Sequence, residues 1–323
     1  MSFSLPLEKY THSISEVTIG ATSREGGNCS YAVKVGGEST MPYLLKDGSE
    51  PHRAVVAMEI TDIIPEEWPQ ALKEPFKDVF DKPGAWASKC LKDYGADLIC
   101  LKLQGAHPDF GNRTPEDCAR VAREVLKTSK APLVILGCGD DEKDSQILPA
   151  VSLALKGQRC LIGDATEDNY RTLTATCLAD GHNIIAESPI DVNIAKQLNI
   201  LISDMGMPVD KIVINPTIGG LGYGMEYAYS IMERARLAAL SGDSTLACPF
   251  ICFVGQEAWR AKEACVAENI SPNWGSEKIR GVLWEAVTAV CVLESGADIL
   301  IMRHPEAVKA VKTYINSLNK KAR

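Results

Sequence analysis

Short apolar runs alternate with amphipathic segments along the chain from residue 54 onward. Most of the apolar runs are rich in Val, Ile and Leu without regular polar positions, which is typical of strands covered on both faces of a sheet. We predict eight strands, at residues 54–60, 97–103, 133–137, 159–163, 183–187, 211–215, 250–255 and 298–302. Eight strand–helix units in about 270 residues indicate a (β/α)8 TIM barrel, because a doubly wound sheet needs fewer units or a second domain.

The segments between these strands have the periodicity of amphipathic helices. The clearest covers 114–127, with Thr114 at the N-cap and Pro115 at the first helical position. Gly-Ala-Asp precedes two of the strands, at 95–97 and 296–298, where the glycine ends a helix. Further helices are predicted to begin near Ser145, Thr166, Asp191, Met225, Ser276 and Pro305.

The first 53 residues have a different pattern. Three short strands are predicted at 16–20, 31–35 and 41–45, with Gly-rich turn signals at 26–28 and 36–37 between them. We therefore expect an N-terminal β-hairpin extension over residues 1–53 and a barrel over 54–323. The extension would cap one end of the barrel or bind a partner.

Composition narrows the choice of partners and compartment. The formal charge of −8 and the pI near 5.3 argue against nucleic acid or an anionic membrane as the main partner. No apolar run approaches the roughly 18 residues of a membrane span, and the N-terminus lacks the pattern of a signal peptide, so we expect a cytoplasmic protein. The eleven cysteines lie mostly inside apolar segments, which favours reduced, buried thiols over disulfides.

A glycine-dense loop follows the strand predicted at 211–215. Asn215-Pro216 ends this strand, and Gly219, Gly220, Gly222 and Gly224 follow within nine residues. Glycine allows positive φ and close approach of a ligand to the main chain, and such loops at strand ends commonly bind ligands in α/β proteins. Two readings stay open, contact with a ligand or partner and plain turn chemistry. The spacing matches neither a dinucleotide fingerprint nor a P-loop.

In a barrel of this kind, the carboxyl ends of the strands and the loops after them carry function. Polar residues at these ends include Glu59, Lys102, His107, Asp141, Glu187, Thr217 and His304. The cofactor-binding residues predicted from this geometry are Cys138, Gly139, Asp140, Asp164, Thr166, Ser188, Asn215, Gly219, Gly220, Leu221, Gly222, Gln256 and Arg303.

Other familiar site patterns are missing from the sequence. The histidines form no H-E-x-x-H, and no C-x-x-C occurs, so neither a zinc nor an iron–sulfur site is expected on this chain. No G-x-S-x-G supports a hydrolase. Asp180 and His182 match the start of the cobalt-ligating D-x-H-x-x-G motif, but the glycine is absent and the segment precedes a strand, so His182 is interpreted as structural.

The acids at the strand ends have two interpretations. Asp140, Asp164 and Glu187, with Asn215, would point into one pocket from neighbouring strands and bind a polar heterocycle. Alternatively, Asp164 and Ser188 cap the helices that follow them, since Asp and Ser are favoured at N-caps.

Four long segments carry a family resemblance. They are PLEKYTHSISEVTIGAT near the N-terminus, VAMEITDIIPEEWP, LVILGCGDDEKDSQILP and INPTIGGLGYGMEYAYSIMERAR. With these segments the chain resembles the small subunit of the corrinoid iron–sulfur protein, equivalently the delta subunit of acetyl-CoA decarbonylase/synthase, over nearly its whole length.

The resemblance implies a methyl carrier built on a barrel related to pterin-binding methyltransferases. A cobalamin-type corrinoid would be shared with a large subunit that also carries a [4Fe–4S] cluster. The carrier would accept a methyl group from methyltetrahydrofolate through a separate methyltransferase and deliver it to acetyl-CoA synthase, in the reductive acetyl-CoA pathway. No residue of this chain is then expected to be catalytic, since the cofactor does the chemistry.

A second hypothesis is a stand-alone pterin-binding methyltransferase that uses Asp140, Asp164 and Asn215 to bind the pterin. The N-terminal extension and the glycine-rich loop suit an obligate partner better than a small pocket, which favours the carrier.

Overall fold

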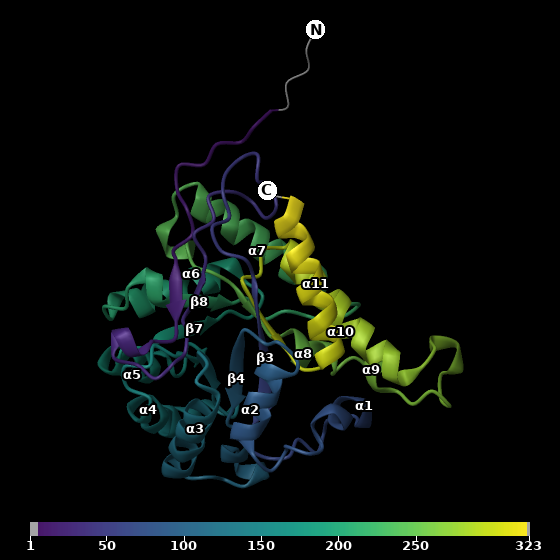
Figure 1. Ribbon diagram of the computed structural model, residues 1–323. Coiled ribbons are helices and arrows are strands. Elements are labelled where there is room, and N and C mark those ends of the chain that lie inside the picture. The colour runs from purple at the N-terminus through teal and green to yellow at the C-terminus, as the bar shows by residue number, and fades with distance from the viewer. Residues whose placement is uncertain (1–5, 322–323) are drawn as a thin grey trace.

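The computed structural model describes residues 6–321 and is a (β/α)8 barrel with an antiparallel N-terminal hairpin, as predicted (Figure 1). The barrel strands pair in parallel in the order β8-β7-β6-β5-β4-β3-β10-β9, and a bridge between Ile214 and Phe250 joins the two ends of this sheet. The strands are β3 (Val55–Thr61), β4 (Leu98–Lys102), β5 (Leu133–Leu136), β6 (Leu161–Ala165), β7 (Asn183–Glu187), β8 (Ile212–Asn215), β9 (Ile251–Cys252) and β10 (Ile299–Met302).

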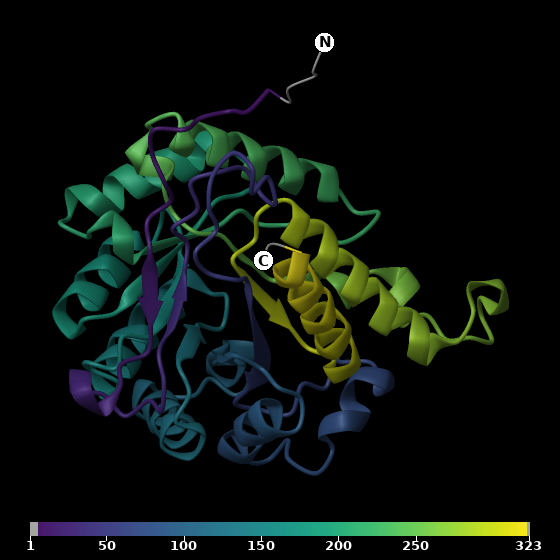
Figure 2. The same ribbon diagram turned by 45° about the horizontal axis from the view of Figure 1, so that its top comes forward.

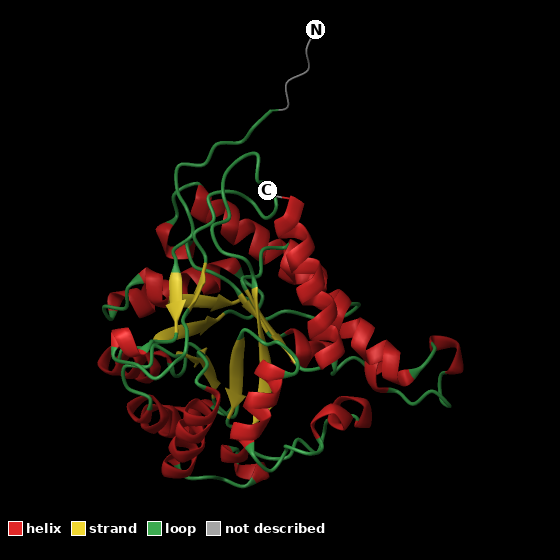
Figure 3. Ribbon diagram, viewed as in Figure 1, coloured by secondary structure: helices red, strands yellow, loops and turns green. Residues whose placement is uncertain are grey.

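Helices surround the strands, and Figure 3 shows them in red around the yellow sheet. The larger helices are α2 (Pro83–Lys92), α3 (Pro115–Ser129), α4 (Asp141–Ala154), α5 (Tyr170–Asp180), α6 (Val192–Asp204), α7 (Met225–Leu240), α10 (Glu277–Glu294) and α11 (Pro305–Lys321). Three shorter ones are α1 (Gln70–Lys73), α8 (Val254–Ala258) and α9 (Lys262–Cys265).

Two helix starts show how local sequence sets the boundaries. The Thr114 hydroxyl accepts a hydrogen bond from the Asp117 backbone N–H at 3.2 Å, which confirms the predicted N-cap of α3. Helix α5 begins at Tyr170 rather than near Thr166, because the Asn169 side chain accepts from the Thr166 N–H at 2.9 Å and holds a turn there.

The strand predicted at 250–255 is much shorter than expected. Only Ile251–Cys252 pair as β9, and Val254 already begins α8. The apolar run therefore continues into a buried helix, an ambiguity that periodicity does not resolve for short runs.

Side chains of the barrel strands alternate between two cores. In β3, Val55 and Ala57 face the barrel interior, and Val56, Met58 and Ile60 pack against the helices. Both sets are buried, and this explains why the strands carry no polar alternation.

The N-terminal hairpin covers the amino-terminal ends of the barrel strands. It consists of β1 (Val17–Ile19) and β2 (Val33–Val35), and its Val17, Ile19 and Val35 join the interior core. The Asn183 side chain, at the start of β7, donates to the Thr18 carbonyl at 2.9 Å. In Figure 2 the purple hairpin lies beside the strands. The expected cap over one end of the barrel is therefore present, and the mouth at the carboxyl ends stays open.

The prediction of a strand at 41–45 is wrong. These residues form turns, with the Leu44 N–H donating to the Met41 carbonyl at 3.1 Å and Tyr43 at a φ of 60°. Apolar residues alone suggested a strand, but Pro42 and the nearby Gly48 favour turns.

A buried ionic network fixes the extension to the barrel. Arg236 of α7 donates to Glu38 at 2.7 Å, to the Gly296 carbonyl at 2.7 Å and to Asp298 at 3.2 Å. All three charged side chains are buried. Burial works to lower the pKa of Arg236, but Asp298 and Glu38 outweigh it and raise that pKa above its ordinary value.

Candidate functional site

Strand alternation places polar side chains in the last interior layer at the barrel mouth. Below this layer the interior residues are apolar, such as Ala57, Cys100 and Val213. Continuing the same alternation by two residues gives Glu59, Lys102 and Asn215. The mouth is therefore a polar floor above an apolar core.

A cavity of about 320 Å³ opens in this floor. It lies at the carboxyl ends of β4 to β9, where TIM barrels bind their ligands. Its lining residues are Lys102, Leu136, Gly137, Gly139, Asp141, Asp144, Asp164, Thr166, Glu187, Asn215, Thr217, Ile218, Phe253, Gln256 and Glu257. Five carboxylates against a single lysine make the cavity acidic.

Asp164 of β6 has the most perturbed environment in the cavity. Its Oδ1 atom is buried without a hydrogen-bond partner. Burial and the nearby Glu187 carboxylate raise the pKa of Asp164 well above its ordinary value, while Lys102 works in the opposite direction. A carboxyl with a raised pKa takes up a proton more readily and then both donates and accepts hydrogen bonds.

Thr217 supplies a second buried oxygen without a partner in the same cavity, its Oγ1. Its backbone has a φ of 53°, and its N–H donates to the Asn215 side chain at 3.0 Å. Buried polar atoms are nearly always hydrogen-bonded in native proteins, so two such atoms lining one open cavity indicate a polar ligand group.

Lys102 and Glu187 complete the electrostatics of the floor. The Lys102 ammonium donates to the Gln256 side chain at 3.1 Å. Burial and then Asp141 raise the pKa of Glu187. The lysine is therefore the only cation that faces these acids among the residues lining the cavity.

The predicted site residues divide into two groups. Gly139, Asp164, Thr166, Asn215 and Gln256 line the cavity together. The other eight do not line it, and each has an evident structural role.

The residues outside the cavity on the loops after β5 and β7 serve the start of the next helix. Asp140 caps α4, accepting from the Lys143 N–H at 2.8 Å. The Ser188 hydroxyl donates to the Asp191 carbonyl at 2.6 Å, and Asp191 itself caps α6. The capping interpretation is thus wrong for Ser188 and for Asp164, which lies within β6 and lines the cavity.

Cys138 and Arg303 are likewise committed to internal contacts. The Cys138 backbone N–H donates to the buried Asp144 at 2.7 Å, and burial raises the pKa of its thiol to about 12, so it is no nucleophile. Arg303 forms a bidentate pair with Glu59 at 2.7 and 3.1 Å and lies over the Trp68 ring. Although burial opposes ionisation, Arg303 and Lys102 hold the pKa of Glu59 below its ordinary value.

The glycine-dense loop has packing reasons for its composition. A Cβ on Gly219 would lie 2.2 Å from the Tyr223 carbonyl oxygen, and one on Gly220 would lie 3.0 Å from the Glu257 carbonyl oxygen. Gly222 and Gly224 have φ values of 78° and 90°. The loop therefore folds on itself and on α8, and it runs from the cavity edge at Ile218 toward α10.

No metal-binding cluster of three or more His, Cys, Asp or Glu side chains occurs among residues 6–321. His182 is buried at the closed end of the barrel, where it accepts from the Cys160 N–H at 3.1 Å, so its structural interpretation is confirmed. Nine of the eleven thiols are buried and the other two partly so, and none is in a disulfide.

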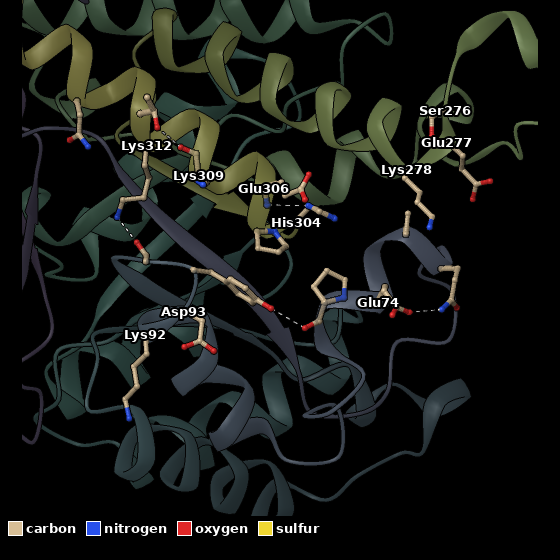
Figure 4. A pocket seen from close by; sticks show the side chains of 18 of the residues that line it. Glu74, Lys92, Asp93, Ser276, Glu277, Lys278, His304, Glu306, Lys309 and Lys312 are labelled. Atoms are coloured by element: carbon tan, nitrogen blue, oxygen red, sulfur yellow. Dashed lines mark hydrogen bonds between the residues drawn. The ribbon is translucent and has the colours of Figure 1, made fainter.

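A larger groove of about 1170 Å³ lies on the side of the barrel between α2, α10 and α11 (Figure 4). It has lysines and acids interspersed, including Lys92, Asp93, Lys309 and Lys312. Lys312 pairs with Asp97 at 2.7 Å. His304 is a buried side chain in this groove. Burial lowers the pKa of its imidazole, which accepts a hydrogen bond from the Glu306 N–H at 3.2 Å. The groove lies outside the ring of strands, between helices, whereas the cavity opens at the carboxyl ends of six neighbouring strands, so the cavity is the candidate site.

A family model described as CO dehydrogenase/acetyl-CoA synthase delta subunit matches residues 16–316. The chain belongs to this family. It is 34% identical over 319 residues to the acetyl-CoA decarbonylase/synthase complex subunit delta of Archaeoglobus fulgidus, covering 97% of this chain and 70% of that protein. The corresponding subunit of Methanocaldococcus jannaschii is 33% identical over 317 residues, covering 98% of this chain and 76% of that protein.

Solved structures similar to this delta-subunit family member share its fold at low identity. The dihydropteroate synthase of Xanthomonas albilineans with 4-aminobenzoic acid has a TM-score of 0.57 at 13% identity, covering 87% of this chain and 99% of that chain. That of Stenotrophomonas maltophilia has a TM-score of 0.53 at 15% identity, covering 82% and 93%. The family resemblance and the barrel predicted from the sequence are both confirmed. None of the described helices is long and apolar enough to cross a membrane.

Sequence reasoning omitted several cavity residues from the site. Glu187 was expected in a shared pocket and Lys102 was recognised at a strand end, but neither was among the predicted cofactor-binding residues, and Asp144 and Phe253 were missed. The available signal was strand phase: Lys102 and Glu187 stand two residues after Cys100 and Ile185, which face the interior. Asp144 had no such signal, because it reaches the cavity from the first turn of α4.

Proposed function

We propose that this chain is the corrinoid-holding subunit of a two-subunit methyl carrier. In this proposal a cobalamin-type corrinoid lies across the barrel mouth and is shared with a large subunit that carries a [4Fe–4S] cluster. The carrier receives a methyl group from methyltetrahydrofolate through a methyltransferase and passes it to acetyl-CoA synthase. Membership in the delta-subunit family supports a role in that complex.

One observation carries the proposal: the mouth holds two buried oxygens, Asp164 Oδ1 and Thr217 Oγ1, without hydrogen-bond partners. A corrin macrocycle is wider than a cavity of about 320 Å³, so it would lie over the opening. The edge of a corrin bears carboxamide groups, whose N–H donors suit acceptors in an acidic floor. The residues present therefore fit the cofactor.

In this arrangement the chain binds and orients rather than reacts. Asp164, Thr217 and Asn215 would hold carboxamides on one side of the cavity, and Gln256 on the other. The bound cofactor would supply a cobalt centre able to accept and release a methyl group. The residues of the described chain that would contact the cofactor from this side are carboxyl, hydroxyl and amide side chains.

A second function, a pterin-binding methyltransferase, is favoured by the size and polarity of the same cavity. A volume of about 320 Å³ is at the low end of small-molecule sites. Asp164 and Asn215, on neighbouring sides, would pair with the donors and acceptors of a bicyclic heterocycle.

Two measurements separate these functions. The chain is produced alone and together with the large corrinoid iron–sulfur subunit, and cobalt and the corrin absorbance are measured after purification. We expect stoichiometric corrinoid in the wild-type pair. The double variant Asp164→Ala/Thr217→Ala should lose at least half of it, and the exposed control Glu167→Gln should retain it. Calorimetric titration of the lone chain with methyltetrahydrofolate gives no binding under the carrier proposal. Micromolar binding of the pterin with no corrinoid in the pair would instead establish the methyltransferase.

A further inference from the structure

The outer face of α10 is apolar where the outer faces of barrel helices are normally polar. We define the α10 face as Leu221, Trp274, Ile279, Leu283, Trp284 and Val287, which line one hollow of about 400 Å³. Ile279, Leu283 and Val287 are 61%, 56% and 42% exposed and lie four residues apart on one side of the helix. Exposed apolar residues on α4, α5 and α6, such as Leu153, Leu178 and Ile200, are not grouped in this way. A contiguous apolar patch of this kind marks an interaction site.

Trp284 contributes the ring that closes the inner side of the hollow. Its side chain lines the hollow, whereas its indole Nε1 is buried and does not face it. A partner in the hollow therefore meets the apolar ring of Trp284, which adds to the apolar character of the face.

The α10 face is continuous with the barrel mouth. Thr217 and Ile218 line the mouth cavity, and the loop after them brings Leu221 into the hollow. The Leu221 N–H donates to Thr288 of α10 at 3.3 Å, and a Cβ on Gly222 would lie 4.0 Å from the Trp284 ring. A protein that covers the mouth therefore reaches the α10 face without leaving the surface.

Charge and size identify the kind of partner. The one charged side chain in the hollow, Arg280, already donates to the Gly275 and Val266 carbonyls and lies over the Trp274 ring. Arg280 is only 8% exposed, so the exposed part of the face is apolar, which favours an apolar partner surface. With Tyr223 and Tyr227 beside it, 53% and 63% exposed, the patch presents on the order of 600 Å², close to the roughly 800 Å² per partner of a standard interface.

We propose that the α10 face is the docking surface for an apolar helix of the large subunit that covers the barrel mouth. This inference rests on the proposed function for the identity of the partner, and the face itself follows from the exposed side chains. The hollow receives one large apolar side chain of that helix, which packs on the ring of Trp284.

Leu283→Asp tests the α10 face, and a matched control residue lies on the opposite side of the barrel. Leu153 on α4 is 64% exposed and lies on the opposite side of the barrel, so Leu153→Asp introduces the same charge at a similar exposure. Binding of the large subunit is measured by calorimetry, folding by circular dichroism, and self-association by sedimentation. We expect Leu283→Asp to weaken binding at least about thirtyfold with an unchanged spectrum, and Leu153→Asp to leave binding unchanged.

Trp284→Phe provides a second readout that does not depend on an added charge. In that variant the buried N–H is lost while most of the ring stays in the hollow, so binding of the large subunit should change less than about twofold. Ile279→Ala instead removes exposed apolar surface from the face, since Ile279 is 61% exposed, and it should weaken binding about twofold to tenfold with an unchanged unfolding midpoint. Unchanged binding by Ile279→Ala would count against the face.

Three results overturn the proposal in distinguishable ways. Equal binding of wild type and Leu283→Asp shows that the large subunit docks elsewhere and leaves the proposed function standing. A wild-type chain that dimerises by itself and becomes monomeric in Leu283→Asp shows that the face is a contact between two copies. Absence of any binding by the wild type refutes the proposed function together with the docking partner.

Discussion

Removing the cation from the Glu38–Arg236–Asp298 network is expected to destabilise the protein strongly. Arg236→Met keeps an unbranched side chain over the Phe250 ring, which the guanidinium now covers at 5.4 Å. It removes hydrogen bonds of 2.7, 2.7 and 3.2 Å to Glu38, Gly296 and Asp298. Two buried carboxylates then remain without a counter-charge.

The magnitude follows from burial. Glu38 is 8% exposed and Asp298 6% exposed, so water cannot replace the lost partner. Removing one member of a buried ion pair costs about 3–5 kcal/mol, against the 0–1 kcal/mol of a surface pair. Burial and Glu38 already raise the pKa of Asp298 well above its ordinary value. Arg236 is a group that lowers this pKa, so without it the pKa of Asp298 rises further and the deficit is smaller at pH 5 than at pH 8.

Equilibrium unfolding in urea measures this cost at both pH values. Arg120→Met is the matched control, since Arg120 pairs with Asp117 on the surface with a side chain 72% exposed, and its change stays within about 0.5 kcal/mol. Glu38→Gln/Arg236→Met removes one of the stranded charges and recovers part of the loss. A cost for Arg236→Met below about 1 kcal/mol at pH 8, or a deficit that does not shrink at pH 5, would refute the reasoning.

Three further predictions follow from the mouth and from α10. Burial raises the pKa of Glu285 to about 7 from 4.5, so its contribution to stability is complete below pH 4.5 and is lost as the pH rises through 7. Relative to Glu285→Gln, the wild type should lose roughly 3 kcal/mol of unfolding free energy across that window, as measured in urea. Parallel plots of unfolding free energy against pH for the two proteins would contradict this. Under the carrier proposal we expect only a small effect, less than about tenfold, on single-turnover methylation of the heterodimer at equal cobalt occupancy in Asp140→Asn, Asp164→Asn and Asn215→Ala. Loss of a general acid or base costs about 10²–10⁴-fold in rate. A thousandfold loss in any of these variants would refute a pure carrier. Gly220→Val forces a side chain against a carbonyl oxygen of α8 at 3.0 Å. It should therefore lower stability by about 1–3 kcal/mol and weaken binding of the large subunit. Wild-type stability and wild-type binding would show that the loop tolerates displacement.

The barrel was predictable because its strands are buried on both faces and its helices on one. Uniform apolar runs and helical periodicity are independent signals, and their eightfold alternation leaves few architectures. The errors occur where the same apolar pattern is compatible with both a strand and a helix. The run after Phe250 is equally apolar in strand and helix, so β9 was predicted too long and the start of α8 was missed.

The site was predictable only where it depends on strand ends. Asp164, Asn215 and Gln256 each follow a predicted strand closely, and all three line the cavity. Arg303 has the same position but pairs with Glu59, a contact between β10 and β3 that no sequence spacing encodes. Likewise Asp140 and Asp164 are the same residue type at neighbouring strand ends. Asp140 lies in the loop four residues after β5 and caps α4, whereas Asp164 lies within β6 and lines the cavity with an unpaired oxygen, so their different distances from the strand decide the role of each carboxyl.

The shortness of β9 gives the cylinder one weak seam. Seven neighbouring strand pairs form the sheet, whereas β8 meets the β9 side through a single bridge, in which the Ile214 N–H donates to the Pro249 carbonyl at 2.9 Å. Native-state opening is expected first where so few hydrogen bonds must break, so the Ile214 amide should exchange with solvent sooner than the amides of β4. Asn215 and Thr217 lie on one side of this seam, and Phe253 and Gln256 on the other. Opening of this seam would therefore move these two walls of the mouth apart while the other strands stay paired.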